Sequence, residues 1–470
     1  MASGETEYLI PEHYGNKIST VDNEGKRKWI YAFKPKGKFY KYRTWLSWFY
    51  MALLFGLPFV KINGKPFLLL NIPKGEFILF GKMFFPQDFI ILGIGMVLAI
   101  VFVIVFTLLF GRVFCGWVCP QTIFLEMMFR KIEFMIEGPA HVQMKAKKQK
   151  IKPKSYYFKK TLKHIIFYLL SFLIAMTFLS YIVGIDVILS AIKEPTKHWI
   201  AIIGLLAFAT VFYFVYAYVR EIACTVICPY GRMQSTLMDK KSMAVAYNYN
   251  RGEPRGRKRK GKEDELGDCI DCGMCVNVCP TGIDIRDGLQ MECVNCTACI
   301  DACDDMMRRV NKPERLITFA TEHQLETNTV GEKSLDLRSK LLLTLLIVLT
   351  AGFTAFMVTL PVFDSTVLRV PGQLYQEGQD GTISNLYKIK IQSKSPKDLP
   401  YSLAVKEENA QIEFVGTKLD SLKSGQLSEE IFFVRFPKGE LEQRKTKINI
   451  QIKSGDKVIQ NKKVTFLNGY

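Results

Sequence analysis

Two cysteine runs with the same spacing constrain the fold of this 470-residue chain more than any other feature. Each run reads C-x2-C-x2-C-x3-C, and every cysteine of the second run follows its counterpart by 24 residues. Three closely spaced thiolates wrap three corners of a cubane, and the fourth cysteine leaves the loop to ligate the other cluster. The spacing therefore predicts a duplicated bacterial-type ferredoxin with two [4Fe–4S] clusters. The predicted ligands are Cys269, Cys272, Cys275 and Cys303 for cluster one, and Cys293, Cys296, Cys299 and Cys279 for cluster two.

Zinc and disulfide bonds are the alternative uses of such cysteines. Zinc motifs use paired cysteines with a longer gap, not three at x2 spacing. All twelve cysteines lie between Cys115 and Cys303, whereas the cysteines of a secreted disulfide framework would not be confined in this way. Reduced, metal-binding thiols are therefore expected. Asp304 follows the second run where ferredoxins usually have proline, which weakens the expected loop geometry but removes no ligand.

The composition predicts spanning helices joined to soluble modules. The chain is 49% hydrophobic, too apolar for an ordinary soluble protein, and 23% charged, too polar for a pure membrane bundle. A spanning helix needs roughly 20 apolar residues. Five segments meet that length: 44–62, 88–110, 163–184, 199–219 and 340–361. Residues 121–137 are apolar on one side only, and Glu126, Arg130, Lys131 and Glu133 predict an amphipathic helix lying at the interface.

The distribution of Lys and Arg predicts the topology. The net charge is +19, and the positive residues gather before the first span, in the loop 111–162 and after Arg220. The positive-inside rule places these segments on the cytoplasmic side. We therefore expect a multi-pass membrane protein, with the N-terminus and ferredoxin on the cytoplasmic side and the C-terminal domain outside. The basic run 251–262 is interpreted as a solvated linker, and no nucleic-acid partner is expected.

After residue 363 the long apolar runs end, and hydrophobic and polar residues alternate with a period of two. Segments such as 386–392, 431–436 and 447–452 alternate or run apolar as strands do, with Gly- and Asp-containing turns between them. About a hundred residues of this pattern predict an immunoglobulin-like β-sandwich.

A second internal repeat lies next to the spans. Cys115 and Cys119, and likewise Cys224 and Cys228, form Cys-x3-Cys-Pro units that each follow a span and an arginine. A spacing of four predicts both sulfurs of a pair on one helical face. Four converging thiols would suit a soft ion such as Cu(I), or could act as redox dithiols. The alternative is that they are buried packing residues, since free cysteine packs as a small hydrophobe.

The predicted fold is mixed: a multi-pass α-helical membrane domain, an inserted α+β ferredoxin and an immunoglobulin-like β-sandwich. The expected divisions are a leader 1–43, a four-helix membrane domain 44–240 with both Cys-x3-Cys-Pro units, a ferredoxin insert 241–339 with core 263–312, a fifth span 340–361 and a β domain 363–470.

This combination resembles the FixG/RdxA/CcoG family of bacterial membrane iron–sulfur proteins. The resemblance rests on the Cys-x3-Cys-Pro units, the paired ferredoxin runs and the β domain, including the segment 380–391. It implies a role in maturation of cbb-type haem–copper cytochrome c oxidase, through cupric-reductase-like electron transfer that converts Cu(II) to Cu(I). The family's Cys-x3-Cys-Pro cysteines correspond to Cys115, Cys119, Cys224 and Cys228, the candidate copper-binding or redox thiols. The implied partners are a cytoplasmic electron donor and, through the β domain, the oxidase or a copper chaperone.

Two other functions are compatible with the same motifs. One is a respiratory electron carrier linked to the quinol pool. The other is a non-catalytic assembly scaffold with structural clusters.

Overall fold

The computed structural model describes residues 26–468 except 74, 86–87, 257–265, 332–336, 360–362, 373, 379–380, 396–397, 408, 417, 440–442 and 456. Most of the predicted leader, the basic run from 257 and its acidic continuation to 265 lie outside the described residues. The chain divides into two compact units. The first comprises residues up to Gly56, Ile94–Leu179 and Ile188–Thr350, and the second comprises Leu57–Gly93, Ser180–Val187 and Ala351 onward.

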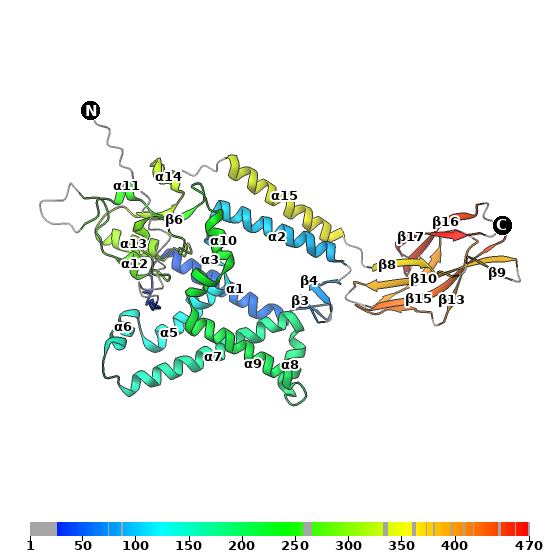
Figure 1. The fold of residues 1–470 in the computed structure, drawn as a ribbon, viewed down its shortest axis with the longest axis horizontal. Coiled ribbons are helices and arrows are strands. Elements are labelled where there is room, and N and C mark those ends of the chain that lie inside the picture. The colour runs from blue at the N-terminus through cyan, green and yellow to red at the C-terminus, as the bar shows by residue number, and fades with distance from the viewer. Residues whose placement is uncertain are drawn as a thin grey trace. The chain divides into compact units, whose positions relative to one another are not determined.

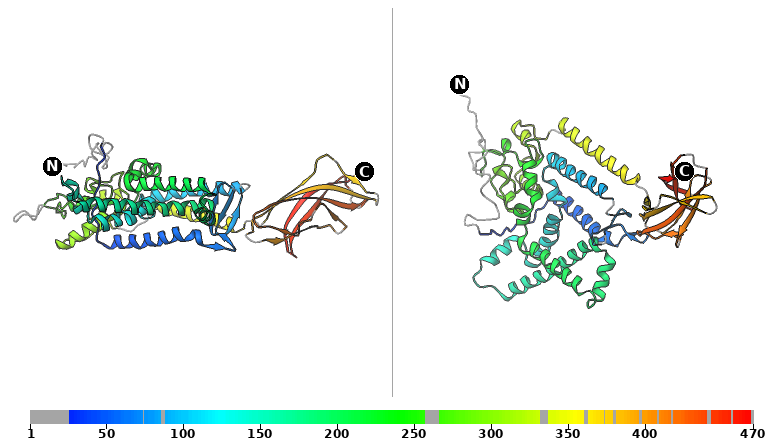
Figure 2. Two further views of the ribbon diagram at one scale, coloured as in Figure 1. Left: turned by 90° about the horizontal axis from the view of Figure 1, so that it is seen from below. Right: turned by 45° about the vertical axis from the view of Figure 1, so that its right-hand side comes forward.

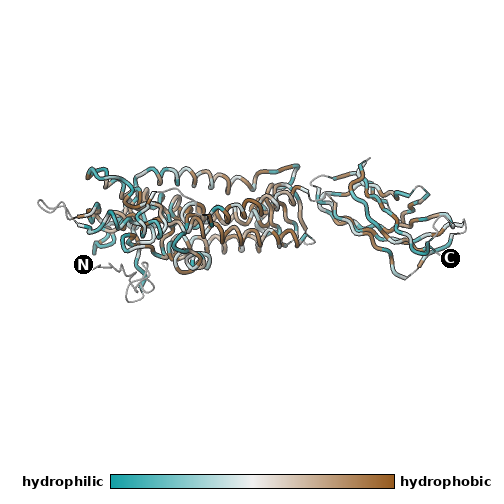
Figure 3. Tube along the Cα trace, turned by 90° about the horizontal axis from the view of Figure 1, so that it is seen from above, coloured by the Kyte–Doolittle hydropathy of each residue, from teal (hydrophilic) through white to brown (hydrophobic). Residues whose placement is uncertain are grey.

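Four described helices are long and apolar enough to cross a membrane. They are α2 (Phe89–Phe110), α7 (Lys154–Val183), α9 (Trp199–Phe214) with its π-helical continuation η5 (Val215–Val219), and α15 (Leu337–Thr359) (Figure 1). Hydrophobic residues gather along the helical part of the chain in Figure 3. The protein is therefore a membrane protein, and the predicted spans 88–110, 163–184, 199–219 and 340–361 each fall on one of these helices.

The first predicted span, 44–62, is misplaced. Helix α1 runs from Lys38 to Gly56 and is followed by a 3-10 turn, Leu57–Phe59, and a short hairpin of β1 (Lys61–Ile62) and β2 (Lys65–Pro66). Pro58 ends the helix because proline lacks an amide hydrogen and disfavours helical backbone before it. The helix instead begins in the basic leader, and α1 is not among the four candidate spans of the described chain.

The segment after the first Cys-x3-Cys-Pro unit is buried, not interfacial. It forms α4 (Pro120–Ile123), the π-helical turn η4 (Phe124–Phe129) and α5 (Arg130–Glu137). Phe124 and Phe129 pack with Met51 of α1, Phe167 of α7 and Tyr216 of η5. Arg130 and Glu133 are only 3% and 4% exposed, so the predicted amphipathic helix at the interface is wrong. Remaining helices of this region are α3 (Val113–Trp117), α6 (Ala140–Lys148), α8 (Ile185–Lys193), η6 (Ala223–Ile227) and α10 (Pro229–Leu237).

The ferredoxin insert keeps the 24-residue duplication in its backbone. Helix α12 (Met274–Asn277) follows Gly273 at φ 66°, and α13 (Ala298–Arg309) follows Thr297 at φ 64°. The antiparallel pair β6 (Ala244–Tyr247) and β7 (Ile317–Ala320) closes the module. Its shorter elements are α11 (Tyr249–Gly252), η7 (Ile285–Asp287) and α14 (Glu322–Glu326).

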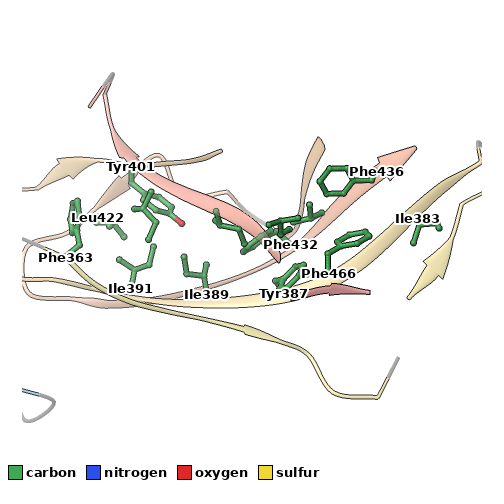
Figure 4. Packing of buried hydrophobic residues seen from close by; sticks show 14 residues of the cluster. Phe363, Ile383, Tyr387, Ile389, Ile391, Tyr401, Leu422, Phe432, Phe436 and Phe466 are labelled. Atoms are coloured by element: carbon green, nitrogen blue, oxygen red, sulfur yellow. The ribbon is translucent and has the colours of Figure 1, made fainter. Parts of the chain in front are cut away.

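The C-terminal domain is the predicted β-sandwich (Figures 1 and 2). One sheet has the order β13-β15-β10-β8, with β9 also paired to β10, and the other has the order β12-β16-β17. Tyr387, Phe432 and Phe466 meet between the sheets (Figure 4), and the Tyr387 hydroxyl donates to the Thr465 carbonyl at 2.9 Å. The strands are β8 (Phe363–Arg369), β9 (Gln376–Glu377), β10 (Thr382–Ser393), β11 (Leu399–Pro400), β12 (Ser402–Val405), β13 (Gln411–Val415), β14 (Ser421–Leu422), β15 (Leu427–Pro437), β16 (Lys445–Ser454) and β17 (Lys457–Leu467).

A small meander belongs to the same unit as the sandwich. It consists of β3 (Leu68–Asn71), β4 (Glu76–Leu79) and β5 (Lys82–Phe84). Lys394 forms an ion pair of 2.5 Å with Asp88, just after the meander, and both side chains are nearly buried.

Candidate iron–sulfur and thiol sites

The first three cysteines of the second run gather around one internal cavity. Cys293, Cys296 and Cys299 line it, together with Cys279 from the end of the first run. Cys275 also reaches its wall. The spacing predicts that the fourth cysteine of each run joins the other run. In the structure, Cys279 of the first run does lie with the cysteines of the second run.

Cys303 lies with the first run. Burial raises the pKa of the Cys303 thiol to about 12, and the neighbouring Cys275, Asp304, Cys269 and Cys272 add to that rise. Asp304, which stands where ferredoxins usually have proline, accepts a hydrogen bond from the Arg315 amide at 2.8 Å and so anchors the chain beyond α13.

The eight ferredoxin cysteines fit iron–sulfur clusters. All are free thiols, and six of them pack in one apolar core with Ile283, Ile285 and Ile300. Sets of four cysteine thiolates of this kind hold [4Fe–4S] clusters. No three His, Cys, Asp or Glu side chains among the described residues converge tightly enough for a single metal ion. Cysteines around a cavity suit a multi-atom cubane better than one ion.

The two Cys-x3-Cys-Pro units share one local structure. Cys115 lies in α3 and Cys224 in η6, whereas Cys119 and Cys228 are the extended N-cap residues of α4 and α10. Proline at the first position of a helix is favoured because its missing amide hydrogen needs no partner there. A helix therefore restarts within each unit, and the prediction that each pair lies on one continuous helical face is wrong. The two units still share a matching backbone hydrogen bond. The Cys119 amide donates to the Phe114 carbonyl at 2.9 Å, and the Cys228 amide donates to the Ala223 carbonyl at 2.8 Å.

The helix that follows each unit contacts a cysteine of the other unit through a polar side chain. The Cys115 thiol donates to the Gln234 side-chain oxygen of α10 at 2.9 Å, and Cys224 Sγ lies 3.9 Å from the Thr122 hydroxyl of α4. Burial, with a smaller contribution from the other thiols of the set, raises the pKa of Cys115 to about 11 and that of Cys224 to about 12. The four membrane-face thiols, Cys115, Cys119, Cys224 and Cys228, therefore interact electrostatically, although no three of them converge tightly enough for a single metal ion among the described residues.

The first unit packs directly on cluster-two cysteines. Cys115 and Cys296 belong to one buried apolar cluster. A Cβ atom on Gly116 would lie 2.4 Å from the Val294 carbonyl oxygen and 3.0 Å from the Cα of Cys296. The Trp117 indole donates to the Asn295 carbonyl at 3.3 Å.

Arg112 lies between the two sites. Its guanidinium opposes the burial-driven rise in the pKa of Cys115, through charge and a hydrogen bond, and its charge does the same at Cys293. Gly231 leaves room for it, because a Cβ there would lie 2.7 Å from a guanidinium nitrogen. The repeated arginine before each unit is visible in the sequence, but its position between the sites is not.

A buried charge network ties the repeats together. Arg220 bonds Glu133 at 3.0 Å, and Arg130 bonds Glu221 at 2.6 Å. Although burial opposes ionisation of Glu133, the charges of Arg220 and Lys163 hold its pKa below the usual range. Sequence reasoning assigned no role to Glu221 or Gln234.

The fold and the site define a membrane-bound iron–sulfur redox protein. Family models match as a 4Fe-4S binding domain at residues 92–137, a 4Fe-4S dicluster domain at 219–322 and the immunoglobulin-like fold at the C-terminus of FixG at 353–469. Protein RdxA of Cereibacter sphaeroides is 33% identical over 378 residues, covering 76% of this chain and 79% of that protein. Protein RdxB of the same organism is 30% identical, covering 82% and 83% respectively. Nitrogen fixation protein FixG of Rhizobium meliloti is 30% identical, covering 63% and 58%. The chain belongs to the FixG/RdxA family.

Proposed function

We propose that this protein reduces Cu(II) to Cu(I) at its membrane-face thiols during assembly of a cbb-type cytochrome c oxidase. Each copper ion takes up one electron, supplied by a cytoplasmic donor through the ferredoxin. When bound, the [4Fe–4S] clusters supply one-electron transfer. Cluster one is assigned to Cys269, Cys272, Cys275 and Cys303, and cluster two to Cys293, Cys296, Cys299 and Cys279. Cavity lining by Cys279 and the electrostatic neighbours of Cys303 support these sets.

The packing of the Cys115–Gly116 segment on the loop that holds Cys296 carries the proposal. A cluster-two cysteine and a membrane-face thiol share one buried apolar cluster, and the Gly116 backbone touches the Cys296 segment. This contact gives electrons a short route from the ferredoxin to the four thiols. At the other end, Cys272 is exposed, which suits entry from a soluble donor at cluster one.

The chemistry of the thiols suits copper as substrate. Soft thiolates favour Cu(I). Because burial raises the pKa of Cys115 and Cys224, both are protonated at neutral pH without metal, and copper must displace their protons. The Arg112 guanidinium is placed to balance the negative charge of a Cys115 thiolate, and the Gln234 oxygen orients the protonated thiol.

The proposed topology follows from charge. The basic leader, the loop 111–162 and the ferredoxin insert 241–339 belong on the cytoplasmic side of the bacterial cytoplasmic membrane. Helix α1, about 28 Å long at 1.5 Å per residue, then crosses as part of the membrane domain 44–240 despite its basic first turns. The β domain 363–470 lies outside, where it would meet the oxidase or a copper chaperone.

The test uses anaerobic purified protein that is first reduced and then mixed with Cu(II). Cu(I) is measured with a chelating dye, and cluster oxidation is followed by absorbance. The variant with Cys115, Cys119, Cys224 and Cys228 all changed to Ser should keep its iron and lose copper-dependent oxidation. Cys303→Ser, by contrast, should lose iron as well. Unchanged Cu(I) formation in the four-Ser variant would refute the assignment. Wild-type iron above the roughly eight atoms of two clusters, with the excess lost in the four-Ser variant, would mean that these thiols hold iron.

In the cell, the matching measurement is oxidase copper content. A strain that makes only the four-Ser variant should assemble a copper-poor oxidase. Normal copper content together with altered respiration would favour a quinol-linked electron carrier.

A further inference from the structure

A cavity of about 410 Å³ lies at the charged end of α7, away from the cysteine sites. Its wall is formed by the leader at Trp29 and Tyr31, by helices α5 and α6, by the first turns of α7 and by the end of η5. The functions derived above do not use it.

Four lysines in the wall carry charge that no carboxylate balances. Lys147, Lys152, Lys159 and Lys160 line the cavity, and none of them forms an ion pair within the described parts of the chain. The wall also contains two carboxylates, but both are already paired. Lys163 lies 3.3 Å from Glu133 and 2.6 Å from Glu137, and Arg220 binds Glu133 as well. The cavity is therefore strongly positive.

Aromatic rings contact three of these four lysines without neutralising their charge. Lys147 Nζ lies 5.8 Å from the centroid of the Tyr31 ring, and Lys152 and Lys160 lie 4.9 and 5.6 Å from that of Tyr156. Cation–π contacts at these distances contribute modest attraction and leave the charge available. The wall also includes Ser155 in the first turn of α7, where free backbone amides favour an anion.

The cavity lies where hydrocarbon gives way to headgroups. Lys163 is the last Lys, Arg, Asp or Glu of α7, and the helix continues uncharged to Val183. Tyr218, also in the wall, stands at the end of the span Trp199–Val219. Beyond the cavity, exposed apolar side chains continue from Tyr218 along α9: the Phe214 ring lies 5.4 Å from the Tyr218 ring, and Val211 follows one turn further. An anion with apolar tails fits both the positive cavity and the apolar surface beyond it.

We propose that this cavity binds the headgroup of an anionic phospholipid, with its phosphate on Lys147, Lys152 and Lys160 and its acyl chains along the exposed apolar side chains of α9. Basic pockets between spanning helices recognise such headgroups by charge. Bound lipid would join the leader to α6 and α7.

The test measures lipid retained by the full-length, cluster-loaded protein by native mass spectrometry, after exchange into vesicles of phosphatidylglycerol or of phosphatidylcholine. The cavity variant is Lys147→Gln, Lys152→Gln, Lys160→Gln. The matched control is Lys145→Gln, Lys148→Gln, Lys150→Gln, which removes the same charge from the same segment outside the cavity wall. Iron content confirms that each variant is folded.

Wild type and control should retain phosphatidylglycerol in preference to phosphatidylcholine, and the cavity variant should lose that retention by on the order of tenfold or more. Equal loss in the control would overturn the proposal, because net charge alone would explain the binding. Displacement of the lipid by millimolar inorganic phosphate would also overturn it, because the site would then bind free anions.

Discussion

Gly116 touches the backbone of Val294 so closely that no Cβ fits between them. The hypothetical Cβ would lie 2.4 Å from the Val294 carbonyl oxygen. This contact joins the membrane-face Cys-x3-Cys-Pro unit to the loop of the second cysteine run. It fixes how near Cys115 lies to Cys296.

Gly116→Ala should therefore slow electron transfer more than it disturbs folding. The methyl group must push the Cys115 segment away from Cys296, at a cost of roughly 1–3 kcal/mol from overpacking. We expect iron content to be retained and copper-dependent oxidation of the reduced protein to slow several-fold. Gly204→Ala in α9 is the control, because nothing lies within 4 Å of a Cβ there. Equal rates in both variants would show that this contact does not govern the transfer.

The ferredoxin could be predicted from the sequence because its determinants are local. The 24-residue repeat fixes ligand spacing, and the structure repeats the left-handed residues as well, with Asp271 and Asn295 at φ 50° and 52°. The contact of Gly116 with Val294 could not be predicted, since it joins segments far apart in the chain and depends on tertiary packing.

Asp301→Ala should destabilise the junction between α1 and the ferredoxin. The Asp301 carboxylate accepts hydrogen bonds from the amides of Phe39 at 3.1 Å and Tyr40 at 2.6 Å, in the first turn of α1. Losing a carboxylate cap costs about 1 kcal/mol. Thermal unfolding should report this loss, whereas Asp305→Ala, which removes an exposed pair with Arg309, should change stability by less than about 0.5 kcal/mol. Similar stability of the two variants would argue against the cap.

The burial of Arg130 and Glu133 shows where sequence reasoning failed. Their charges favour an interfacial position when only residues 121–137 are considered. In the structure, Glu133 pairs with Arg220, 87 residues away, and this ion pair offsets the cost of desolvating the Glu133 carboxylate. Only the parallel between the two Cys-x3-Cys-Pro units hinted that the segment after the first unit meets the arginine before the second.

Glu133→Gln should make stability less sensitive to acid. The pKa of Glu133 is lowered in the folded protein, so its stabilising contribution is present above the unfolded pKa, about 4.3, and is lost as the pH falls through the folded value. At neutral pH the variant should lose roughly 3 kcal/mol, because Arg220 keeps its charge in a buried site. The stability gap between wild type and variant should be widest above about pH 5 and should narrow below about pH 4.

Unfolding temperatures measured across this pH range provide the check. Glu194→Gln removes an exposed pair with Lys197 and should change little at any pH. A gap for Glu133→Gln that stays constant with pH would mean that ionisation of Glu133 does not contribute to stability.

Gln234→Met should weaken copper capture without affecting the clusters. Gln234 is fully buried. Its side-chain oxygen accepts a hydrogen bond from the Cys115 thiol, and its side-chain nitrogen donates to the Thr107 hydroxyl at 3.3 Å. Gln234 therefore orients Cys115 from the opposite repeat. Methionine has a similar shape but cannot accept strongly from the thiol. Loss of a group that orients a metal ligand typically costs 10–100-fold in affinity, and we expect a loss of about that size for Cu(I) in competition with a chelator. Thr236→Ala, on the exposed side of α10, should bind Cu(I) as wild type does. If Gln234→Met also binds normally while Cys115→Ser does not, the thiol captures copper without help from Gln234.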